Sequence, residues 1–347
     1  MRRESAWWTP EIYAGRRHCL LQRARIVKAV RAFFDAQDFL EIEAAALQVS
    51  PGNEAHIAAF ATFFNAHGGD SAPLYLHSSP EFDCKKLLAA GETRIFSFGH
   101  VFRNGERSKL HHPEFTMLEW YRAKVPYRAL IDDCAALAAA AARAAGVKIF
   151  QFEGSTLDPF AAPEILTVAE AFARYAEMDL LATLDDGAPN REALAAQARK
   201  IGLRVSGDDS WSDLFSKILS EKIERRLGHG RLTVLIDYPA SEAALARRKP
   251  EDARLAERFE LYGCGVELAN AFGELTDAAE QRRRFEAEMA ERQRVYGESY
   301  PIDADFLDAL AIMPEASGIA LGFDRLVMLA TGAQKIEQVL WAPVAQP

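Results

Sequence analysis

A single carboxylate interrupts an apolar strand pattern in residues 115–121. Alternate residues of a strand share one face, so Phe115, Met117, Glu119 and Tyr121 point the same way and the residues between them point the other way. Burying a carboxylate among apolar neighbours is costly unless a cation or hydrogen-bond donors accompany it. The alternative is a half-exposed strand with Glu119 in water, and this segment alone favours neither interpretation.

The loop that precedes this strand carries three cations and two histidines. It spans residues 103–113 and follows a second predicted strand over Arg94–Phe102. Two antiparallel strands joined by such a loop can hold a polyphosphate, because Arg makes paired hydrogen bonds to phosphate oxygens. A charged loop that is simply solvated is the commoner arrangement for such a sequence.

A predicted hairpin over Phe259–Leu268 carries a glutamate on each strand. A two-residue turn at Gly263-Cys264 would place Glu260 directly opposite Glu267. Like charges at opposing positions destabilise a hairpin, but a divalent cation reverses the sign, and carboxylates suit Mg²⁺ that arrives with a nucleotide. Alternatively, both glutamates are exposed and repel each other weakly through water.

Downstream of the hairpin, an amide, an aromatic ring and a carboxylate alternate. Asn270, Phe272 and Glu274 lie two residues apart and share a face. Such a face can hold a cationic amino group. Glu267 has the opposite parity, so it joins this face only if a bulge lies between. An ordinary amphipathic strand would show the same pattern.

A strand with glycines leads into an apolar helix over residues 318–330. Gly318 and Gly322 permit close approach of a ligand to the backbone. Arg325 stands where the helix begins, and can meet a phosphate there. Glycines chosen for packing alone would also explain the pattern.

The remaining elements indicate α+β architecture with an antiparallel sheet, because strands and helices are interspersed without a regular βα repeat. Residues 183–210 are polar and we expect them to be loop-rich. Predicted helices span 20–39, 129–145, 167–175, 213–227 and 278–296, and further strands span 74–77 and 231–238.

Composition excludes several classes of protein. The chain has 347 residues, 49% of them hydrophobic, with a net charge of −9, which fits a globular protein and disfavours general nucleic-acid binding. Its four cysteines are scattered, so we expect no zinc site and no disulfide framework, and a reducing cytoplasmic location. We see no signal peptide and no membrane-spanning segment.

Together these features resemble the class II aminoacyl-tRNA synthetases. Residues 102–104 and 111–119 are similar to motif 2, and residues 322–325 to motif 3. The likeness is greatest to the lysyl-tRNA synthetase group, and within it to the truncated paralogues that form the elongation factor P–(R)-β-lysine ligase family. It implies one catalytic domain over residues 1–347, with an antiparallel sheet flanked by helices, a variable insertion at about 150–230, and a homodimer.

The resemblance implies ATP and Mg²⁺ as cofactors. In that family, Arg103 would contact the α-phosphate and the substrate carboxylate, Arg325 the γ-phosphate, and Phe115 would stack on adenine. Glu260 and Glu267 would bind Mg²⁺. The residues implied to bind ATP are Arg103, Asn104, Gly105, Glu106, His111, His112, Phe115, Glu267, Leu268, Gly322 and Arg325.

The same resemblance implies a pocket for lysine or (R)-β-lysine. Glu81, Glu119 and Glu274 would be its acidic groups, with Tyr121 beside the side-chain amine. Ala320 stands where lysyl-tRNA synthetases carry glycine. The residues implied to bind this substrate are Ser79, Pro80, Glu81, Glu119, Tyr121, Asn270, Phe272, Glu274 and Ala320.

The expected reaction is activation of this amino acid to an aminoacyl-adenylate and transfer to a lysine of elongation factor P. Only about 20 residues precede the first predicted helix, too few for an anticodon-binding domain, so we expect no anticodon-dependent tRNA binding. Two alternatives remain: a minimal ligase for tRNA or a free amino acid, and a non-catalytic regulatory paralogue. Gly105, where motif 2 usually has glutamate, and Ala45, where motif 1 usually has proline, give the second some weight.

Overall fold

One large sheet organises the computed structural model, which describes residues 6–185 and 188–345. Its inner strand pairs, from β5 to β12, are antiparallel, and a parallel strand is added at each edge. The α+β class with an antiparallel sheet is therefore confirmed. The strand order is β1 (Leu40–Ile42), β5 (Arg94–Phe102), β6 (Glu114–Ala123), β15 (Ala316–Gly322), β14 (Val266–Gly273), β13 (Leu255–Gly263), β12 (Thr233–Pro239) and β9 (Glu164–Thr167).

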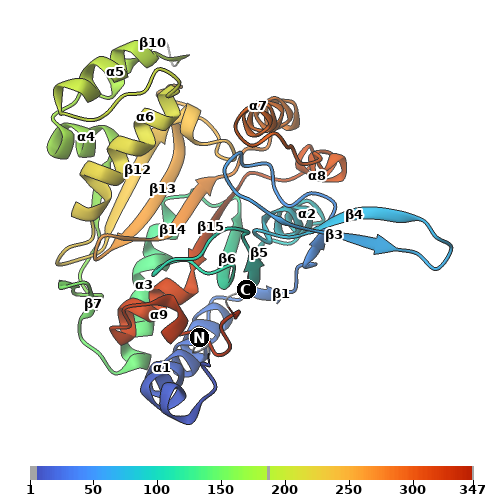
Figure 1. Ribbon diagram of the computed structural model, residues 1–347, viewed down its shortest axis with the longest axis vertical. Coiled ribbons are helices and arrows are strands. Elements are labelled where there is room, and N and C mark those ends of the chain that lie inside the picture. Colours follow the sequence, from blue (N-terminus) through green and yellow to red (C-terminus); the bar gives the residue numbers. More distant parts are fainter. Residues whose placement is uncertain (1–5, 186–187, 346–347) are drawn as a thin grey trace.

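Three helices cover one face of this sheet (Figure 1). They are α1 (Pro10–Asp35), α3 (Ala129–Ala145) and α9 (Phe323–Thr331). Between them and the sheet lies the main hydrophobic core. A row of side chains crosses the sheet on this face, from Trp120 through Ile319 and Ala271 to Phe259, and each is at most 1% exposed. Because side chains alternate along a strand, the residues between these apolar ones face the opposite side of the sheet.

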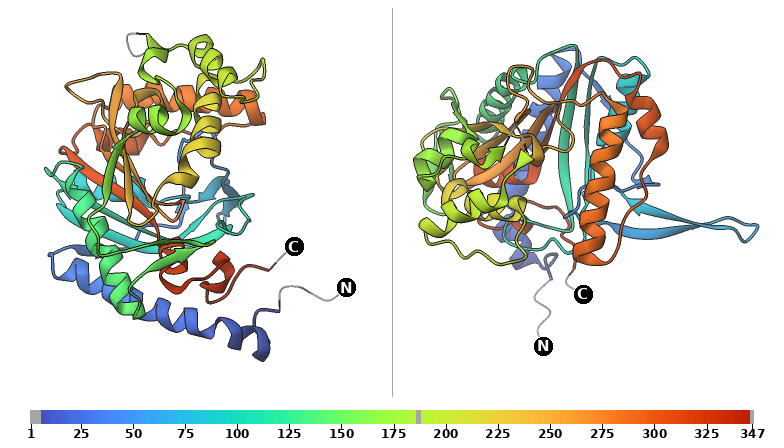
Figure 2. Two further views of the ribbon diagram at one scale, coloured as in Figure 1. Left: turned by 90° about the vertical axis from the view of Figure 1, so that its left-hand side faces the viewer. Right: turned by 90° about the horizontal axis from the view of Figure 1, so that it is seen from above.

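The opposite face is flanked by two groups of helices at its two ends (Figures 1 and 2). The first group packs around its own hydrophobic cluster with β12, and the second surrounds Phe82, Phe285 and Phe306. Between the two groups, the middle of this face holds the candidate site. The first group is α4 (Val168–Ala176), α5 (Arg191–Lys200) and α6 (Trp211–Ile218), and the second is α2 (Glu81–Ala89), α7 (Ala278–Tyr296) and α8 (Ala304–Leu310).

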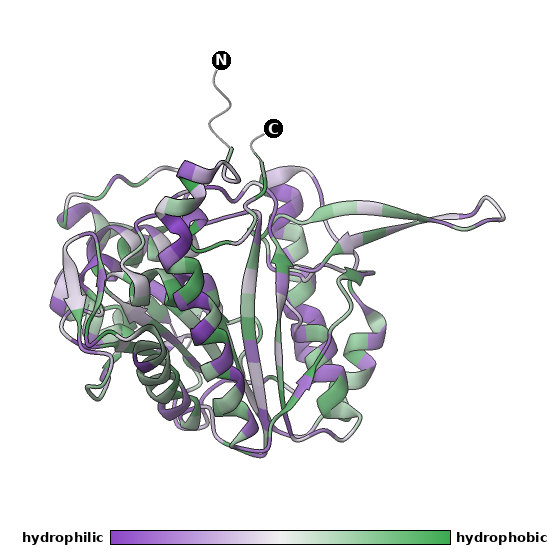
Figure 3. Cartoon of the chain, turned by 90° about the horizontal axis from the view of Figure 1, so that it is seen from below, coloured by the Kyte–Doolittle hydropathy of each residue, from purple (hydrophilic) through white to green (hydrophobic). Residues whose placement is uncertain are grey.

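A long hairpin projects from the body of the molecule, with hydrophobic stretches along its length (Figure 3). It consists of β3 (Phe60–Asn65) and β4 (Ser71–Leu76), joined on one side by β2 (Leu47–Gln48). A small hairpin of β7 (Phe150–Phe152) and β8 (Ser155–Leu157) lies elsewhere, and β10 (Leu184–Asp185) pairs with β11 (Ala188–Pro189).

Several sequence-based boundaries are confirmed and others are wrong. The helix over 278–296 is found as predicted, and α4 begins with a capping box between Thr167 and Glu170. The loop-rich interpretation of 183–210 is wrong because α5 lies inside it, capped by Asn190 and burying Leu194. Residues 186–187, within the predicted insertion, lie outside the described residues.

Two further helices differ in extent. The first helix starts at Pro10 rather than at Leu20. The helix predicted over 213–227 is α-helical only to Ile218, after which it continues as a π-turn over Leu219–Ile223 and a 3₁₀ turn over Glu224–Arg226. Within the described residues, no helix is both long and apolar enough to cross a bilayer.

Phe34 on α1 offers a test of the core. Its ring is fully buried and stacks on Phe96 at 4.5 Å between centroids. Phe34→Ala should lower the free energy of unfolding by about 3–5 kcal/mol, because it removes buried apolar contacts and leaves a cavity. Denaturant titration measures this. The matched control Phe160→Ala, at an exposed position between β8 and β9, should change stability by under about 0.5 kcal/mol. Equal losses would contradict the placement of Phe34.

Candidate active site

Register places the site residues in rows across the sheet. One row runs through four neighbouring strands and presents Glu119, Ala320, Asn270 and Glu260 side by side. Neighbouring strands lie about 4.8 Å apart, so the row spans about 14 Å. The row thereby brings together three distant parts of the chain, which are β6, the β13–β14 hairpin and β15.

A second row on the same face runs beside the first. It contains Tyr121, Gly318, Phe272 and Arg258. Gly318 has no side chain for a steric reason: a Cβ there would lie 2.2 Å from the ring of Tyr121 and 2.3 Å from Oε1 of Glu274. The absence of a side chain at Gly318 thus allows Tyr121 and Glu274 to lie close to the backbone of β15.

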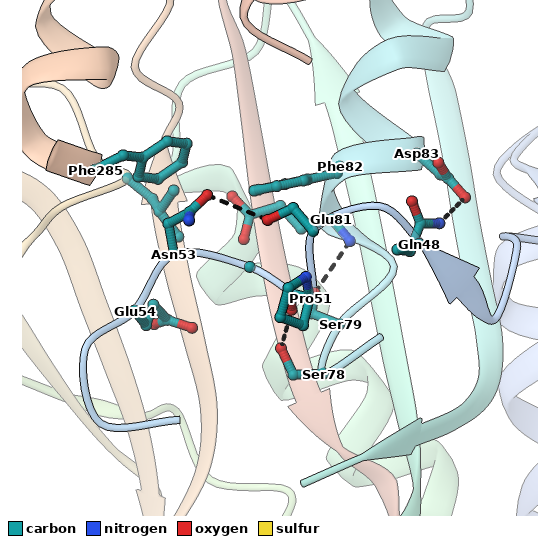
Figure 4. A pocket seen from close by; sticks show the side chains of 13 residues that line it. Gln48, Pro51, Asn53, Glu54, Ser78, Ser79, Glu81, Phe82, Asp83 and Phe285 are labelled. Atoms are coloured by element: carbon teal, nitrogen blue, oxygen red, sulfur yellow. Dashed lines mark hydrogen bonds between the residues drawn. The ribbon is translucent and has the colours of Figure 1, made fainter. Parts of the chain in front are cut away.

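A cavity of about 350 Å³ lies over these rows. It contains most of the residues predicted to bind ATP or the amino acid, and a smaller annex of about 20 Å³ opens beside it, bordered by Glu54, Ser79 and Glu81 (Figure 4). The predicted residues that line the main cavity are Ser79, Glu81, Arg103, Glu106, His111, His112, Phe115, Glu119, Glu260, Glu267, Leu268, Asn270, Phe272, Ala320, Gly322 and Arg325.

Five predicted residues do not line the cavity. Asn104 and Gly105 belong to the turn after Arg103, where the backbone N–H of Asn104 donates to Ala58. Pro80 precedes α2 as its N-cap residue. Tyr121 and Glu274 lie one layer behind the lining and act on it through their neighbours.

Arg103 and Phe115 form a wall at one end of the cavity. The guanidinium lies 5.3 Å from the centre of the Phe115 ring, and both residues line the cavity. The Nε of Arg103 is buried and has no hydrogen-bond partner among the described residues. A buried donor without a partner is costly, so this end of the site suits an anion, and the residues present fit a nucleotide phosphate.

Arg325 enters the same end from the start of α9. It donates to the backbone oxygen of Glu267 at 2.8 Å and to Nε2 of His111 at 2.8 Å. Burial and the charge of Arg325 lower the pKa of His111, so the neutral ring accepts this hydrogen bond while Nδ1 contacts Ser108 at 2.8 Å. The guanidinium is thus held in place beside the cavity.

A buried network ties β6 to α9, the helix that carries Arg325. Asp324, next to Arg325, accepts from the backbone N–H of Thr116 at 2.7 Å and pairs with Arg23 of α1. Arg23 also donates to Oγ1 of Thr116 at 2.7 Å. Because Thr116 adjoins Phe115, this network fixes β6 and α9 relative to each other.

The hairpin glutamates face the cavity, but the predicted pairing between them is wrong. Glu260 pairs with Asn270, and Glu267 pairs with Tyr262. The turn falls at Cys264-Gly265, where both residues have positive φ, rather than at Gly263-Cys264. Leu268 is left over as a bulge between the two registers, and the bulge reverses the parity of Glu267, as the sequence argument required.

Glu260 is largely occupied by neighbouring donors. Its oxygens accept from Arg258 at 2.6 Å, Tyr238 at 2.5 Å and Tyr262 at 2.6 Å, which leaves about one of four lone-pair positions. Within the described residues, no group of three or more His, Cys, Asp or Glu side chains could hold a metal alone. The two carboxylates therefore fit an ion that brings most of its ligands with it, as Mg²⁺ bound to nucleotide phosphates does.

Glu119 forms the other end of the cavity and is 1% exposed. Ser79 donates to one of its oxygens at 2.5 Å and Tyr121 to the other at 2.7 Å. It forms no ion pair within the described part of the chain. Burial, with added repulsion from Glu81, raises the pKa of Glu119 to about 8 despite these two donors. An ammonium group placed beside it would favour the ionised carboxylate.

Sequence reasoning missed Lys85, Arg258 and Glu54. Lys85 of α2 lies 2.6 Å from Glu274, so Glu274 is partnered within the protein rather than facing a ligand. Arg258 donates to both Glu260 and Asn270, and Glu54 borders both the cavity and its annex. For Lys85, the sequence offered one signal, which is its spacing of four residues from Glu81, as on one face of a helix. For Arg258 and Glu54, no local sequence pattern indicates a role.

The raised pKa of Glu119 predicts a pH-dependent stability. The unfolded chain loses this proton near the ordinary value of 4.5 and the folded chain near 8, so the folded state loses stability as pH rises through this window. The difference in unfolding free energy between Glu119→Gln and the unsubstituted chain should therefore shift in favour of the variant by about 4 kcal/mol from pH 5 to pH 8. Denaturant titrations at both pH values measure it.

The exposed Glu286→Gln on α7 is the control for that comparison, and its difference from the unsubstituted chain should stay within about 0.5 kcal/mol. If the difference for Glu119→Gln is the same at both pH values, the carboxyl does not titrate in this window and the account of its environment is wrong.

Comparisons with known proteins agree with this geometry. Residues 14–346 match the family of class II tRNA synthetases (D, K and N). Elongation factor P–(R)-β-lysine ligase of Haemophilus influenzae strain PittGG is 39% identical over 323 residues, covering 92% of this chain and 93% of that protein. The proteins of the same name from Yersinia enterocolitica and Proteus mirabilis are 37% and 38% identical over 99% and 98% of both chains. The chain belongs to the class II tRNA synthetase family.

Proposed function

We propose that this chain is an ATP-dependent ligase that activates lysine or (R)-β-lysine as an aminoacyl-adenylate and transfers the acyl group to a lysine of elongation factor P. The observation that carries this proposal is a single cavity with Arg103 and Arg325 at one end and the unpaired Glu119 at the other. Phe115 and Glu119 lie four residues apart on β6, about 13 Å, which suits a nucleotide and an extended amino acid placed end to end.

In the activation step, the carboxylate of the amino acid attacks the α-phosphorus of ATP and pyrophosphate leaves. Arg103, with its unpartnered Nε, and Arg325 stabilise the negative charge on the phosphates. Mg²⁺ held by Glu260 and Glu267 would neutralise further phosphate charge. No side-chain nucleophile is required, and the rate enhancement comes from positioning and electrostatics.

In the transfer step, the amine of the acceptor lysine attacks the carbonyl carbon of the adenylate. The new C–N bond forms as the C–O bond to AMP breaks. Elongation factor P is the acceptor named for relatives that match over 92–99% of this chain. Anticodon-dependent binding of tRNA plays no part in this proposal.

We further propose that the chain acts as a homodimer in the cytoplasm. The edge strand β1 of the large sheet, and β2 and β3 of the separate small sheet, carry exposed apolar side chains, among them Leu40, Leu47 and Phe63. A partner subunit that covered them would remove apolar surface from water. The four cysteines are buried and unpaired, as expected in a reducing compartment.

Removing either arginine should abolish activation. Arg103→Ala and Arg325→Ala should each lower the rate of ATP–pyrophosphate exchange by about 10²–10⁵, because charge on the transferring phosphoryl group loses its counter-charge. The exposed Arg282→Ala on α7 is the control and should retain full activity. Near-normal exchange in either active-site variant would contradict the proposed phosphate binding by Arg103 and Arg325.

The hairpin carboxylates should couple metal to nucleotide. ATP with Mg²⁺ should raise the melting temperature more than ATP alone, since a ligand that binds only the folded state stabilises it. Glu267→Gln should lose most of that additional gain while keeping the gain from ATP alone. Thermal melts with and without chelator measure it, and an unchanged metal-dependent gain in the variant would count against Glu267 as a ligand.

Ala320 should tune the choice between the two lysines. It lies directly between Glu119 and Asn270 in the row across the sheet, so its methyl group bounds the space beside the ammonium site. Ala320→Gly should shift the ratio of kcat/KM toward α-lysine by about 1–3 kcal/mol. Exchange assays with lysine, (R)-β-lysine and norleucine measure this and test the proposed function itself.

For the unsubstituted chain, norleucine should be rejected strongly, because it leaves buried Glu119 without its ammonium. Equal activation of norleucine and lysine would refute the proposed function. An unchanged ratio of the two lysines in Ala320→Gly would refute only the role of Ala320.

A further inference from the structure

Lys85 is a buried cation beside the cavity that the proposed reaction does not use. Its side chain is 1% exposed, and its Nζ lies 2.6 Å from Oε2 of Glu274 and 2.5 Å from Oε1 of Glu81. An ammonium in such a place is stable only when carboxylates accompany it. Burial alone would lower the pKa of Lys85, but Glu274 and Glu81 reverse the shift and raise it, so Lys85 stays charged.

The two carboxylates come from different parts of the fold. Glu81 and Lys85 lie four residues apart on α2 and therefore share one face of the helix. Glu274 follows β14, and its backbone N–H donates to Ala316 at 2.9 Å. Lys85 thus connects α2 to the end of the sheet and fixes the side chain of Glu81, which borders the cavity and its annex (Figure 4).

The backbone at Glu81 is connected to Glu119 through a serine. The backbone N–H of Glu81 donates to Oγ of Ser79 at 3.0 Å, and that hydroxyl donates to Glu119 at 2.5 Å. The start of α2, which Lys85 ties to Glu274, therefore also positions the donor of Glu119. Neither Lys85 nor Glu274 lines the cavity, so their influence is indirect.

Lys85 also explains how three glutamates can lie close together here. It pairs with Glu81 and Glu274, whereas Glu119 has hydroxyl donors only. Among these three, Glu119 is therefore the carboxylate left for the ammonium of a ligand, and Lys85 holds Glu81 at the border of the same cavity.

We propose that Lys85 is a positioning residue that sets the specificity of the pocket for a side-chain ammonium, because it partners Glu274 and anchors Glu81 at the cavity that Glu119 lines. This inference rests on the proposed function. It assigns selection for an ammonium group to a residue that does not itself line the cavity.

The neighbouring Lys86 provides a matched control. It has the same side chain on the same helix and is also ion-paired, to Asp303 at 2.8 Å and Asp305 at 3.1 Å. Those partners belong to α8 and its cap, away from the cavity lining. Lys86→Met therefore removes an ion pair from α2 without changing the charge of the pocket.

The test uses the double variant Lys85→Met with Glu274→Gln, which leaves no buried ion of the pair unpartnered. Exchange assays give kcat/KM for lysine and for norleucine and the KM for ATP. With Glu81 no longer anchored, the ratio of lysine to norleucine should fall at least tenfold, while the KM for ATP stays within twofold. Lys86→Met should change neither quantity.

A ratio within threefold of the unsubstituted chain, or an equal loss in ATP binding, would overturn the proposal, since a purely structural role would affect both ligands alike. If the double variant does not fold, Lys85→Met assayed at pH 6 takes its place, because Glu274 can then be buried as the neutral acid, and the same ratio decides. An unsubstituted chain that does not select lysine over norleucine would instead refute the proposed function.

Discussion

The structure depends on one unequal division of charge at the centre of its sheet. Glu81 and Glu274 share the ammonium of Lys85, whereas Glu119 is buried with two hydroxyl donors and no cation. In the absence of a ligand, the burial of Glu119 destabilises the folded state. An ammonium that enters the cavity relieves this cost, so the same feature that weakens the empty protein gives it affinity and selectivity.

The rest of the fold keeps that arrangement in place. Strand β6 presents Trp120 to the helices below and Glu119 to the cavity above, and each neighbouring strand repeats the division in register. Any slip of one residue would exchange the apolar row for the polar one. The contacts of Asp324 with Thr116 and Arg23 secure the opposite end of the cavity, where Arg103 and Arg325 lie.

Much of this arrangement follows from the sequence. Strand alternation gave the correct face for Phe115, Met117 and Glu119, and opposing parity required the bulge that the structure places at Leu268. Turn propensities did not predict the turn of the β13–β14 hairpin correctly, because both Gly263-Cys264 and Cys264-Gly265 could form a two-residue turn. Gly263 packs so tightly against Leu157 and Leu329 that a Cβ would lie 3.0 Å from each, and the turn itself falls one residue later.

The pairing of Lys85 with Glu274 lay beyond local rules for a different reason. The two residues are far apart in the chain and meet only when α2 lies against the end of β14, so no spacing indicates their contact. The same holds for Arg258, whose partners Glu260 and Asn270 meet through strand register. Periodicity predicts which face a side chain occupies, whereas its partner depends on tertiary packing.

The central claim is that this pocket prepares a diamino acid for attachment to a protein. The most direct measurement is the intact mass of elongation factor P after incubation with the chain, ATP, Mg²⁺ and (R)-β-lysine or lysine, with total tRNA as a competing acceptor. The account predicts that elongation factor P gains the mass of one lysyl group in an ATP-dependent manner while tRNA remains uncharged. Unmodified elongation factor P beside aminoacylated tRNA would contradict it.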